Sequence, residues 1–322
     1  MILSDEQVRA GVIGLLKAPT DRDQQTKIGA SNMSNQCDRC LAHEMLGQPR
    51  TSVAADRAWM GSRLGTGIHG HLEGRLNHFT GVDASDELER QRLRRFLVEV
   101  IGLPVTSVAE THTYFADLRG YGPVGGTVDI TFTDEHIGDY KGSTRQKICL
   151  LIDWLAIQRG EDPVFGRKHK YMALFEEGKD GVFRKVVDQL SEREYAAEMA
   201  HMGYKVSGYY GQTQLYMKGK HALRSSLIFI ARDGTGVFDN PAGQRYDDPK
   251  AIHDIHILSF DYDEAYADAL IARAQAIWDH LESGTAPSDF DSHPLCYFCE
   301  TESNDRSTVP AVEATFATPA AA

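Results

Sequence analysis

Residues 122–147 most constrain how this chain can fold, because they read as two strands joined by a turn. The first half alternates apolar and polar residues around Asp129, a period of two that is typical of a β-strand. A polar break follows at 133–136, and the return segment carries Asp139 and Lys141. Residues two apart on a strand share a face, so these two side chains are expected on the same side of the sheet.

Two interpretations of this hairpin follow from its residues alone. Two carboxylates and an ammonium on neighbouring strands suit a hard divalent cation and an activated water. An exposed aspartate and lysine on the solvent face of a hairpin are also an ordinary surface feature. The choice between them depends on the rest of the chain.

Composition sets limits on the class of protein. The chain has 322 residues, 42% of them hydrophobic and 25% charged, which is typical of a globular protein with a sizeable core. Its formal net charge of −12 argues against a protein that coats nucleic acid by bulk electrostatics. A local basic groove remains compatible with that charge, because phosphate contacts act within about 8–10 Å.

The sequence also predicts the cellular setting. No apolar run approaches the roughly 20 residues that span a bilayer, so no membrane association is expected. Residues 1–19 place acids before a short apolar patch and read as an amphipathic helix rather than a signal peptide. The protein is therefore expected in the cytoplasm.

Hydrophobic periodicity predicts a mixed α/β order. Residues 59–79 carry an apolar stripe at helical spacing, with His69 and Glu73 together beside it. Further helices are expected at 86–101, 191–202, 206–220 and 264–283, and further strands at 108–115, 226–231 and 252–261. Residues 148–152 either continue the hairpin or begin another element, and Cys149 among them is expected in the core.

These elements predict one domain over residues 1–300, with a central mixed sheet flanked by helices. Residues 150–205 are expected to form an insertion, and residues 301–322, rich in Thr, Ala and Pro, a disordered tail.

Cysteine spacing predicts a metal site. Two C-x-x-C pairs, Cys37/Cys40 and Cys296/Cys299, lie 256 positions apart (296 − 40) in a chain with one other cysteine. Four thiolates can bind Zn²⁺ tetrahedrally or a [4Fe–4S] cluster, and the cysteine count alone leaves both open. A shared site would join the two ends of the domain and restrict the unfolded chain.

Four motifs occur in one order: G-T-G-I-H-G ending near His69, then Asp129, then Asp139-x-Lys141, then a Gln212-x-x-x-Tyr216 pair. With the cysteines, this order resembles the RecB-like branch of the PD-(D/E)xK nucleases, including its CRISPR-associated and phage iron–sulfur exonucleases. The resemblance implies a restriction-endonuclease-like core and favours [4Fe–4S], with zinc as the alternative.

The resemblance also implies roles for the motif residues. Asp129, Asp139, the backbone carbonyl of Tyr140 and His69 would bind Mg²⁺ or Mn²⁺. Lys141 would orient or deprotonate the attacking water, and Gln212 with Tyr216 would bind the nucleic-acid strand. The helical spacing adds Glu73 as a possible partner of His69 or ligand of a second metal.

Two departures from the family pattern stand out. The 71 positions from Lys141 to Gln212 (212 − 141) exceed the usual gap, which implies the insertion. The family often has one early and three late cysteines, whereas this chain has two pairs.

These observations predict a metal-dependent DNA exonuclease, a hydrolase of phosphodiester bonds that acts on single-stranded ends in recombination, repair, phage replication or CRISPR adaptation. A nucleic-acid-binding or adaptor protein that keeps the fold and the cysteine site without catalysis is the alternative. A zinc-stabilised interaction protein with no DNA affinity is a third class.

Overall fold

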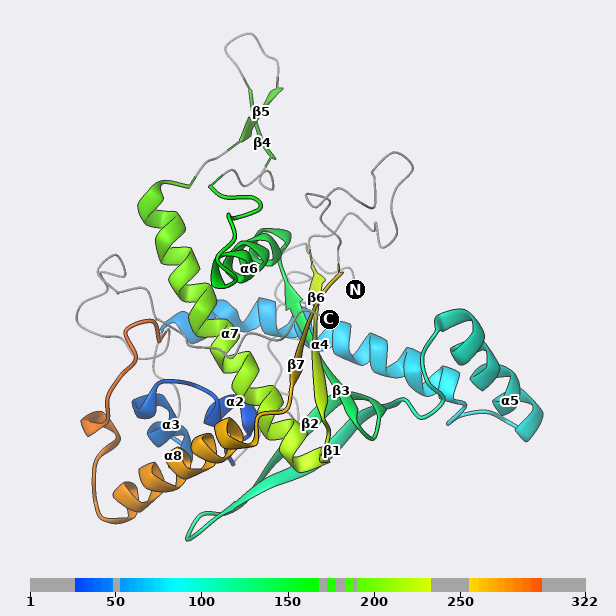
Figure 1. Ribbon diagram of the computed structural model, residues 1–322, viewed down its shortest axis with the longest axis horizontal. Coiled ribbons are helices and arrows are strands. Elements are labelled where there is room, and N and C mark those ends of the chain that lie inside the picture. Colours follow the sequence, from blue (N-terminus) through cyan, green and yellow to red (C-terminus); the bar gives the residue numbers. More distant parts are fainter. Residues whose placement is uncertain are drawn as a thin grey trace, which may run out of the picture.

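The computed structural model describes residues 27–48, 53–167, 173–177, 183–187, 190–232 and 255–296. A five-stranded sheet forms its centre, in the order β1-β2-β3-β6-β7 (Figure 1). Its strands are β1 (Val108–Leu118), β2 (Gly122–Thr133), β3 (His136–Ser143), β6 (Arg224–Ala231) and β7 (Ile255–Asp261).

The sheet is mixed. Strands β1, β2 and β3 are antiparallel neighbours, and β7 is antiparallel to β6. The central pair β3 and β6 is parallel, with Asp139 opposite Leu227 and Ser143 opposite Ala231. The predicted hairpin is therefore confirmed, with only Asp134 and Glu135 between its two strands.

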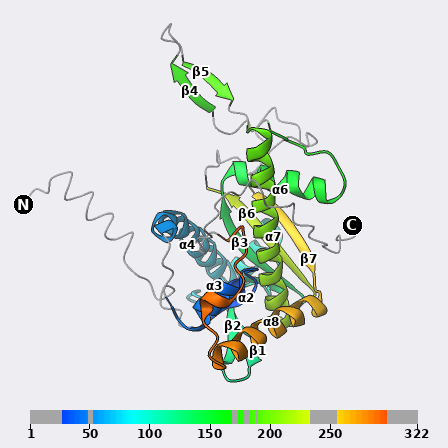
Figure 2. The same ribbon diagram turned by 90° about the vertical axis from the view of Figure 1, so that its left-hand side faces the viewer.

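The described part of the chain has seven helices, together with a π-helical turn at Leu97–Ile101 and a 3₁₀ turn at Pro287–Asp289. The helices are α2 (Ala30–Met33), α3 (Asp38–Met45), α4 (Val53–Thr80), α5 (Glu87–Phe96), α6 (Arg145–Gln158), α7 (Glu192–Lys220) and α8 (Glu264–Glu282). A separate hairpin of β4 (Ala173–Glu177) and β5 (Phe183–Val187) projects away from the sheet (Figure 2).

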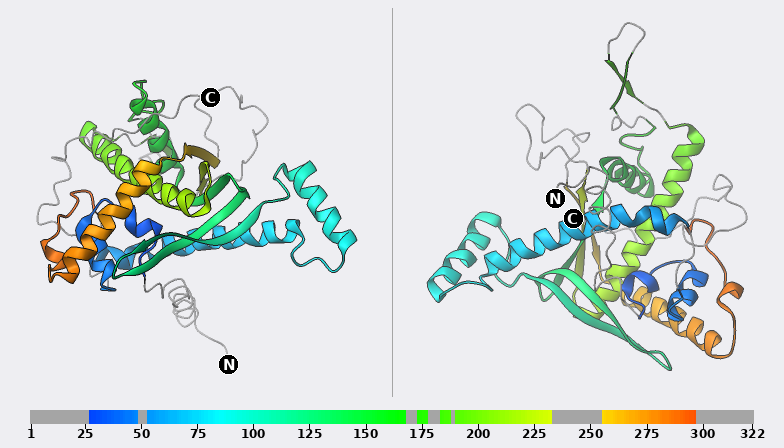
Figure 3. Two further views of the ribbon diagram at one scale, coloured as in Figure 1. Left: turned by 60° about the horizontal axis from the view of Figure 1, so that its bottom comes forward. Right: turned by 180° about the vertical axis from the view of Figure 1, so that it is seen from behind.

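The helices cover both faces of the sheet. Figure 1 views the face under α7, and the right panel of Figure 3 views the opposite face, which α4 crosses. Leu215 of α7 and Leu270 of α8 pack with Val128 in the larger core, while Leu76 of α4 packs with Ile130 on the other side. This arrangement confirms the predicted central mixed sheet flanked by helices.

One helix decides an alternative that the sequence left open, and another is longer than expected. Residues 148–152 belong to α6. Thr144 caps the start of this helix, because its side-chain oxygen accepts a hydrogen bond from the backbone N–H of Lys147. Cys149 is fully buried there, as expected. The segments 191–202 and 206–220 form the single helix α7, whose start is the predicted capping box of Ser191 and Glu194.

Several expectations lie outside the described residues. These are the helix at 1–19, the tail at 301–322 and Cys299. The domain limits and the insertion at 150–205 stay predictions. Among the described residues, no helix has the length and apolar character needed to cross a bilayer.

Helix α7 approaches α2 closely at Gly211, which gives a test of the packing. A Cβ added at Gly211 would lie 2.8 Å from the Cβ of Ser34, whereas one at Gly74 of α4 would meet nothing within 4 Å. We expect Gly211→Ala to lower the free energy of unfolding by about 1–3 kcal/mol through overpacking. Gly74→Ala should raise it by up to about 1 kcal/mol through helix propensity. Urea unfolding measures both, and equal effects would contradict the close approach.

Candidate functional site

The hairpin strands open where the acidic residues lie. The described pairs of β2 and β3 run from Thr133↔His136 to Ile130↔Gly138. Beyond that point the backbone N–H of Tyr140 donates to Asp129 Oδ2 at 2.7 Å. In a regular pair of strands, a backbone carbonyl would accept this hydrogen bond. Here the Asp129 carboxylate accepts it, and the bond holds the carboxylate between β2 and β3.

Helix α4 brings His69 to the same place. His69 Nδ1 lies 3.3 Å from Asp129 Oδ1, and His69 Nε2 lies 2.9 Å from the carbonyl oxygen of Tyr140. The imidazole is therefore held between two of the oxygens predicted as metal ligands. The side chain is largely covered, with 18% of its surface exposed.

Lys141 joins the second acid to α7. Its Nζ lies 2.5 Å from Asp139 Oδ2 and donates to Gln212 Oε1 at 3.0 Å. The same ammonium lies 5.0 Å from the centre of the Tyr209 ring, a cation–π contact. Gln212 Nε2 in turn donates to the hydroxyl of Tyr216 at 3.3 Å. The spacing of Gln212 and Tyr216 on one helical face thus places both beside Lys141.

Burial and charge shift the pKa values in this site. Burial raises the pKa of Asp139, and the nearby Asp129 carboxylate adds to the rise, against the opposing charge of Lys141. Burial also acts to raise the pKa of Asp129, but its contact with His69 outweighs this and the net shift is downward. The two carboxyls therefore shift in opposite directions.

The pKa values of the two cationic groups both rise. Burial acts to lower the pKa of His69 and of Lys141. For His69 the bond to Asp129 and the charges of both aspartates reverse the effect, and for Lys141 the Asp139 carboxylate does so. The buried carboxylates thus favour positive charge beside them.

These donors fit a hard divalent cation. Carboxylate and carbonyl oxygens suit Mg²⁺ or Mn²⁺, and an imidazole favours Mn²⁺. Asp129 and Asp139 are 8% and 3% exposed, and two buried carboxylates in one place need compensating positive charge. In the part of the chain that the structure describes, only a cysteine group has three ligand atoms within 4.8 Å of one another. The ligand atoms of His69, Asp129 and Asp139 are therefore spaced more widely than those of the cysteine group.

That cysteine group is a second candidate metal site. Cys37, Cys40 and Cys296 are all buried, with Sγ atoms within 4.8 Å of one another. Arg39, between the first two, donates from its backbone and side chain to the carbonyls of Asp291 and Phe290, which holds the late segment against α3. Three buried sulfurs fit Zn²⁺ or an iron–sulfur cluster. The predicted joining of the early and late segments is confirmed, while the fourth ligand, Cys299, stays a prediction.

The sequence assigned no role to two tyrosines of α7. Tyr209 lies one turn before Gln212 and faces Lys141, and its helical spacing was the available signal. Tyr204 donates to Asn35 Oδ1, which also accepts from the backbone N–H of Cys37, and no short-range pattern connects residues so far apart. Glu73 lies one turn after His69 on α4, and its proposed role stays a prediction.

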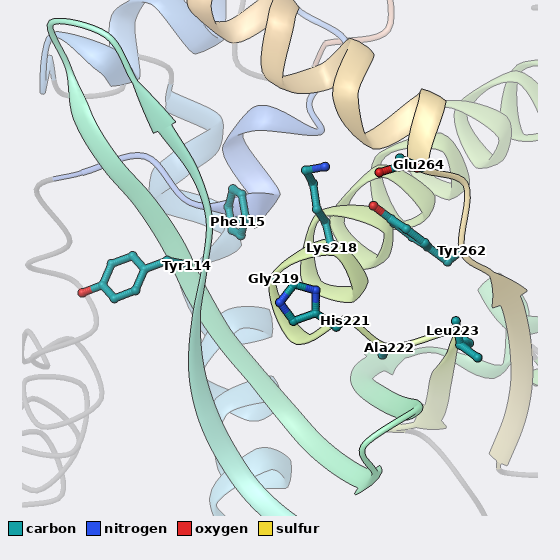
Figure 4. A pocket seen from close by; sticks show the side chains of 9 residues that line it. All are labelled: Tyr114, Phe115, Lys218, Gly219, His221, Ala222, Leu223, Tyr262 and Glu264. Carbon is teal, nitrogen blue, oxygen red and sulfur yellow. The ribbon is translucent and has the colours of Figure 1, made fainter.

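A pocket of about 450 Å³ lies elsewhere, beyond the C-terminal end of α7 (Figure 4). Its lining includes Tyr114 of β1, Lys218 and His221. The Lys218 ammonium already pairs with Asp268 at 2.8 Å. None of the site residues predicted from the sequence lines this pocket. The pocket is therefore separate from the acidic site.

Comparisons with known proteins leave the family open. The sequence matches no protein-family profile and no curated protein. LHK-Exo in complex with dAMP is 13% identical over 80% of this chain and 89% of its own, with a TM-score of 0.34. A second structure of LHK-Exo, an alkaline exonuclease from Laribacter hongkongensis, is 14% identical over 81% of this chain and 91% of its own, with a TM-score of 0.31. A phage-related exonuclease from Haemophilus somnus is 16% identical over 81% of this chain and 96% of its own, with a TM-score of 0.27. These scores are too low to assign a family, so the function must be inferred from this chain's own residues.

Proposed function

We propose that this protein is a metal-dependent nuclease that hydrolyses phosphodiester bonds of DNA, as an exonuclease that acts on single-stranded ends. One observation carries the proposal: His69, Asp129, Asp139, Lys141 and Gln212 come from four elements of the fold and converge where β2 and β3 separate. A chance hairpin with an exposed aspartate and lysine would leave both side chains in solvent.

The residues divide into those that would hold the cation and those that would act on water and substrate. Asp129, Asp139, His69 and the Tyr140 carbonyl would hold Mg²⁺ or Mn²⁺. The bound ion would lower the pKa of a water molecule and polarise a phosphoryl oxygen.

Lys141 would orient the attacking water and stabilise the negative charge that develops on the phosphate. Its pKa is raised, so it stays an ammonium and acts by charge and hydrogen bonding. Gln212 and Tyr216 are 8% and 6% exposed, so we propose that they influence the nucleic-acid strand through the position of Lys141.

A cleavage assay tests the proposal. End-labelled single-stranded, double-stranded and circular DNA are incubated with Mn²⁺, Mg²⁺ or a chelator, with wild type and Lys141→Ala. We expect cleavage of linear single strands in the metal-containing reactions, and a loss of about 10²–10³-fold in Lys141→Ala. DNA binding without metal-dependent cleavage would favour the adaptor alternative, and cleavage of circles would favour an endonuclease.

A further inference from the structure

The early half of the cysteine site depends on a turn at Asn35. Asn35 Oδ1 accepts a hydrogen bond from the backbone N–H of Cys37 at 3.0 Å, a side-chain turn that leads the chain into α3. Cys37 is the N-cap of α3, and its side chain makes no capping bond. Cys40 follows in the first turn of the same helix. The position of the Asn35 side chain therefore affects how both early sulfurs are presented.

The late half of the site depends in the same way on His293. The carbonyl oxygen of His293 accepts from the backbone N–H of Cys296 at 2.8 Å. Its Nδ1 accepts from the backbone N–H of Leu295 at 3.1 Å. These two bonds form the turn that ends at Cys296, and that turn places Cys296 Sγ 3.3 Å from Cys40 Sγ.

One side chain of α7, that of Tyr204, contacts both turns. Its hydroxyl donates to Asn35 Oδ1 at 2.7 Å, so this oxygen accepts two hydrogen bonds. Its ring packs against the ring of His293, with 4.5 Å between the centroids and 31° between the planes. The two turns lie 258 positions apart in the sequence (293 − 35), and Tyr204 joins them across that distance.

We propose that Tyr204 is the positioning residue of the cysteine site, which holds the turns of Asn35 and His293 so that the early and late sulfurs meet at one metal. Tyr204 acts through its two neighbours and is not itself a ligand. Residues that hold the ligands of a metal in place commonly contribute about 10–100-fold to its affinity. The proposal concerns the cysteine site alone and does not depend on the nuclease function.

Release of metal from the purified protein tests this role. Wild type, Tyr204→Phe and Tyr195→Phe are purified anaerobically with the metal that they carry and are mixed with excess chelator. Elemental analysis then follows the zinc and iron that remain bound. We expect Tyr204→Phe to release its metal about tenfold faster than wild type, because phenylalanine keeps the ring and loses the bond to Asn35.

Tyr195→Phe is the matched control. It removes a hydroxyl from the same helix, one that donates to Asp153 Oδ2 at 2.9 Å. A general loss of stability would affect both phenylalanine variants alike, whereas positioning of the sulfurs predicts faster release from Tyr204→Phe alone. Equal release rates for the two variants would overturn the proposal, and so would a wild-type protein that carries neither zinc nor iron.

A double variant tests the route through Asn35. Without the Asn35 side chain the Tyr204 hydroxyl loses its acceptor, so Asn35→Ala/Tyr204→Phe should release metal within about twofold of the rate of Asn35→Ala. Effects that multiply in the double variant would overturn this route and place the action of the hydroxyl elsewhere. Tyr204→Leu also removes the ring from His293 and should release metal faster than Tyr204→Phe. Equal rates for these two would overturn the role of the ring.

Discussion

Replacing Asp139 with Asn is expected to reduce metal-dependent cleavage at least about 10³-fold while leaving the fold intact. Asp139 is almost fully buried, and its carboxylate is the partner of Lys141 at 2.5 Å. Asparagine keeps the size and one acceptor oxygen, but it removes the negative charge that a cation needs. The single substitution therefore affects both a proposed metal ligand and the electrostatic setting of Lys141.

The stability of Asp139→Asn should change little, because two effects oppose each other. The variant loses the ion pair with Lys141 and also loses the repulsion from Asp129, which helps to raise the pKa of Asp139. We expect the free energy of unfolding in chelator to stay within about 2 kcal/mol of wild type. Lys141 keeps its bond to Gln212 in the variant, which limits the cost of leaving an ammonium buried.

The matched control is Asp134→Asn, which removes an acid from the exposed turn of the same hairpin. It should cleave at the wild-type rate, since the turn lies at the far end of β3 from Lys141. Rates are measured on end-labelled DNA in Mn²⁺ and Mg²⁺, with folding checked by circular dichroism. Equal rates for Asp139→Asn and wild type would end the catalytic assignment of the hairpin.

The acidic site could be predicted from the sequence to the extent that it depends on local periodicity. Alternation around Asp129 and the spacing of Asp139 and Lys141 follow from strand geometry, and helical spacing joins Gln212 to Tyr216. The approach of His69 to Tyr140 depends on how α4 crosses the sheet, and no local pattern sets that crossing. The order of motifs in the family resemblance, and not a local pattern, suggested that His69 belongs to the acidic site.

What the sequence did not reveal depends on long-range packing. Tyr204 and Asn35 are 169 positions apart, and only the packing of α7 against α2 brings the hydroxyl of Tyr204 to the side-chain oxygen of Asn35. Residues 148–152 were ambiguous because a short apolar run fits a buried strand and a buried helix equally well. The Thr144 cap decides for the helix, yet a single threonine is a weak signal in a sequence.

Replacing Cys40 with Ala is expected to release the metal proposed for the cysteine site and to lower the free energy of unfolding by at least about 3 kcal/mol. Cys40 Sγ lies 3.3 Å from Cys296 Sγ, across 256 positions of sequence. A metal held by both closes a loop that includes the whole sheet, so its loss frees the unfolded chain and separates α3 from the late segment. Cleavage should fall with stability.

Cys149→Ala is the matched control, because Cys149 is a fully buried cysteine of α6 that lies outside the metal group. It should keep its metal and lose only about 1 kcal/mol, the cost of a small cavity. Elemental analysis after anaerobic purification counts zinc and iron in both variants, and urea unfolding gives their stabilities. One zinc per chain would identify a zinc site, and about four irons with visible absorption a [4Fe–4S] cluster. Metal retained at the wild-type level in Cys40→Ala would mean that the buried sulfurs cluster without holding an ion, and that packing alone joins the two ends of the domain.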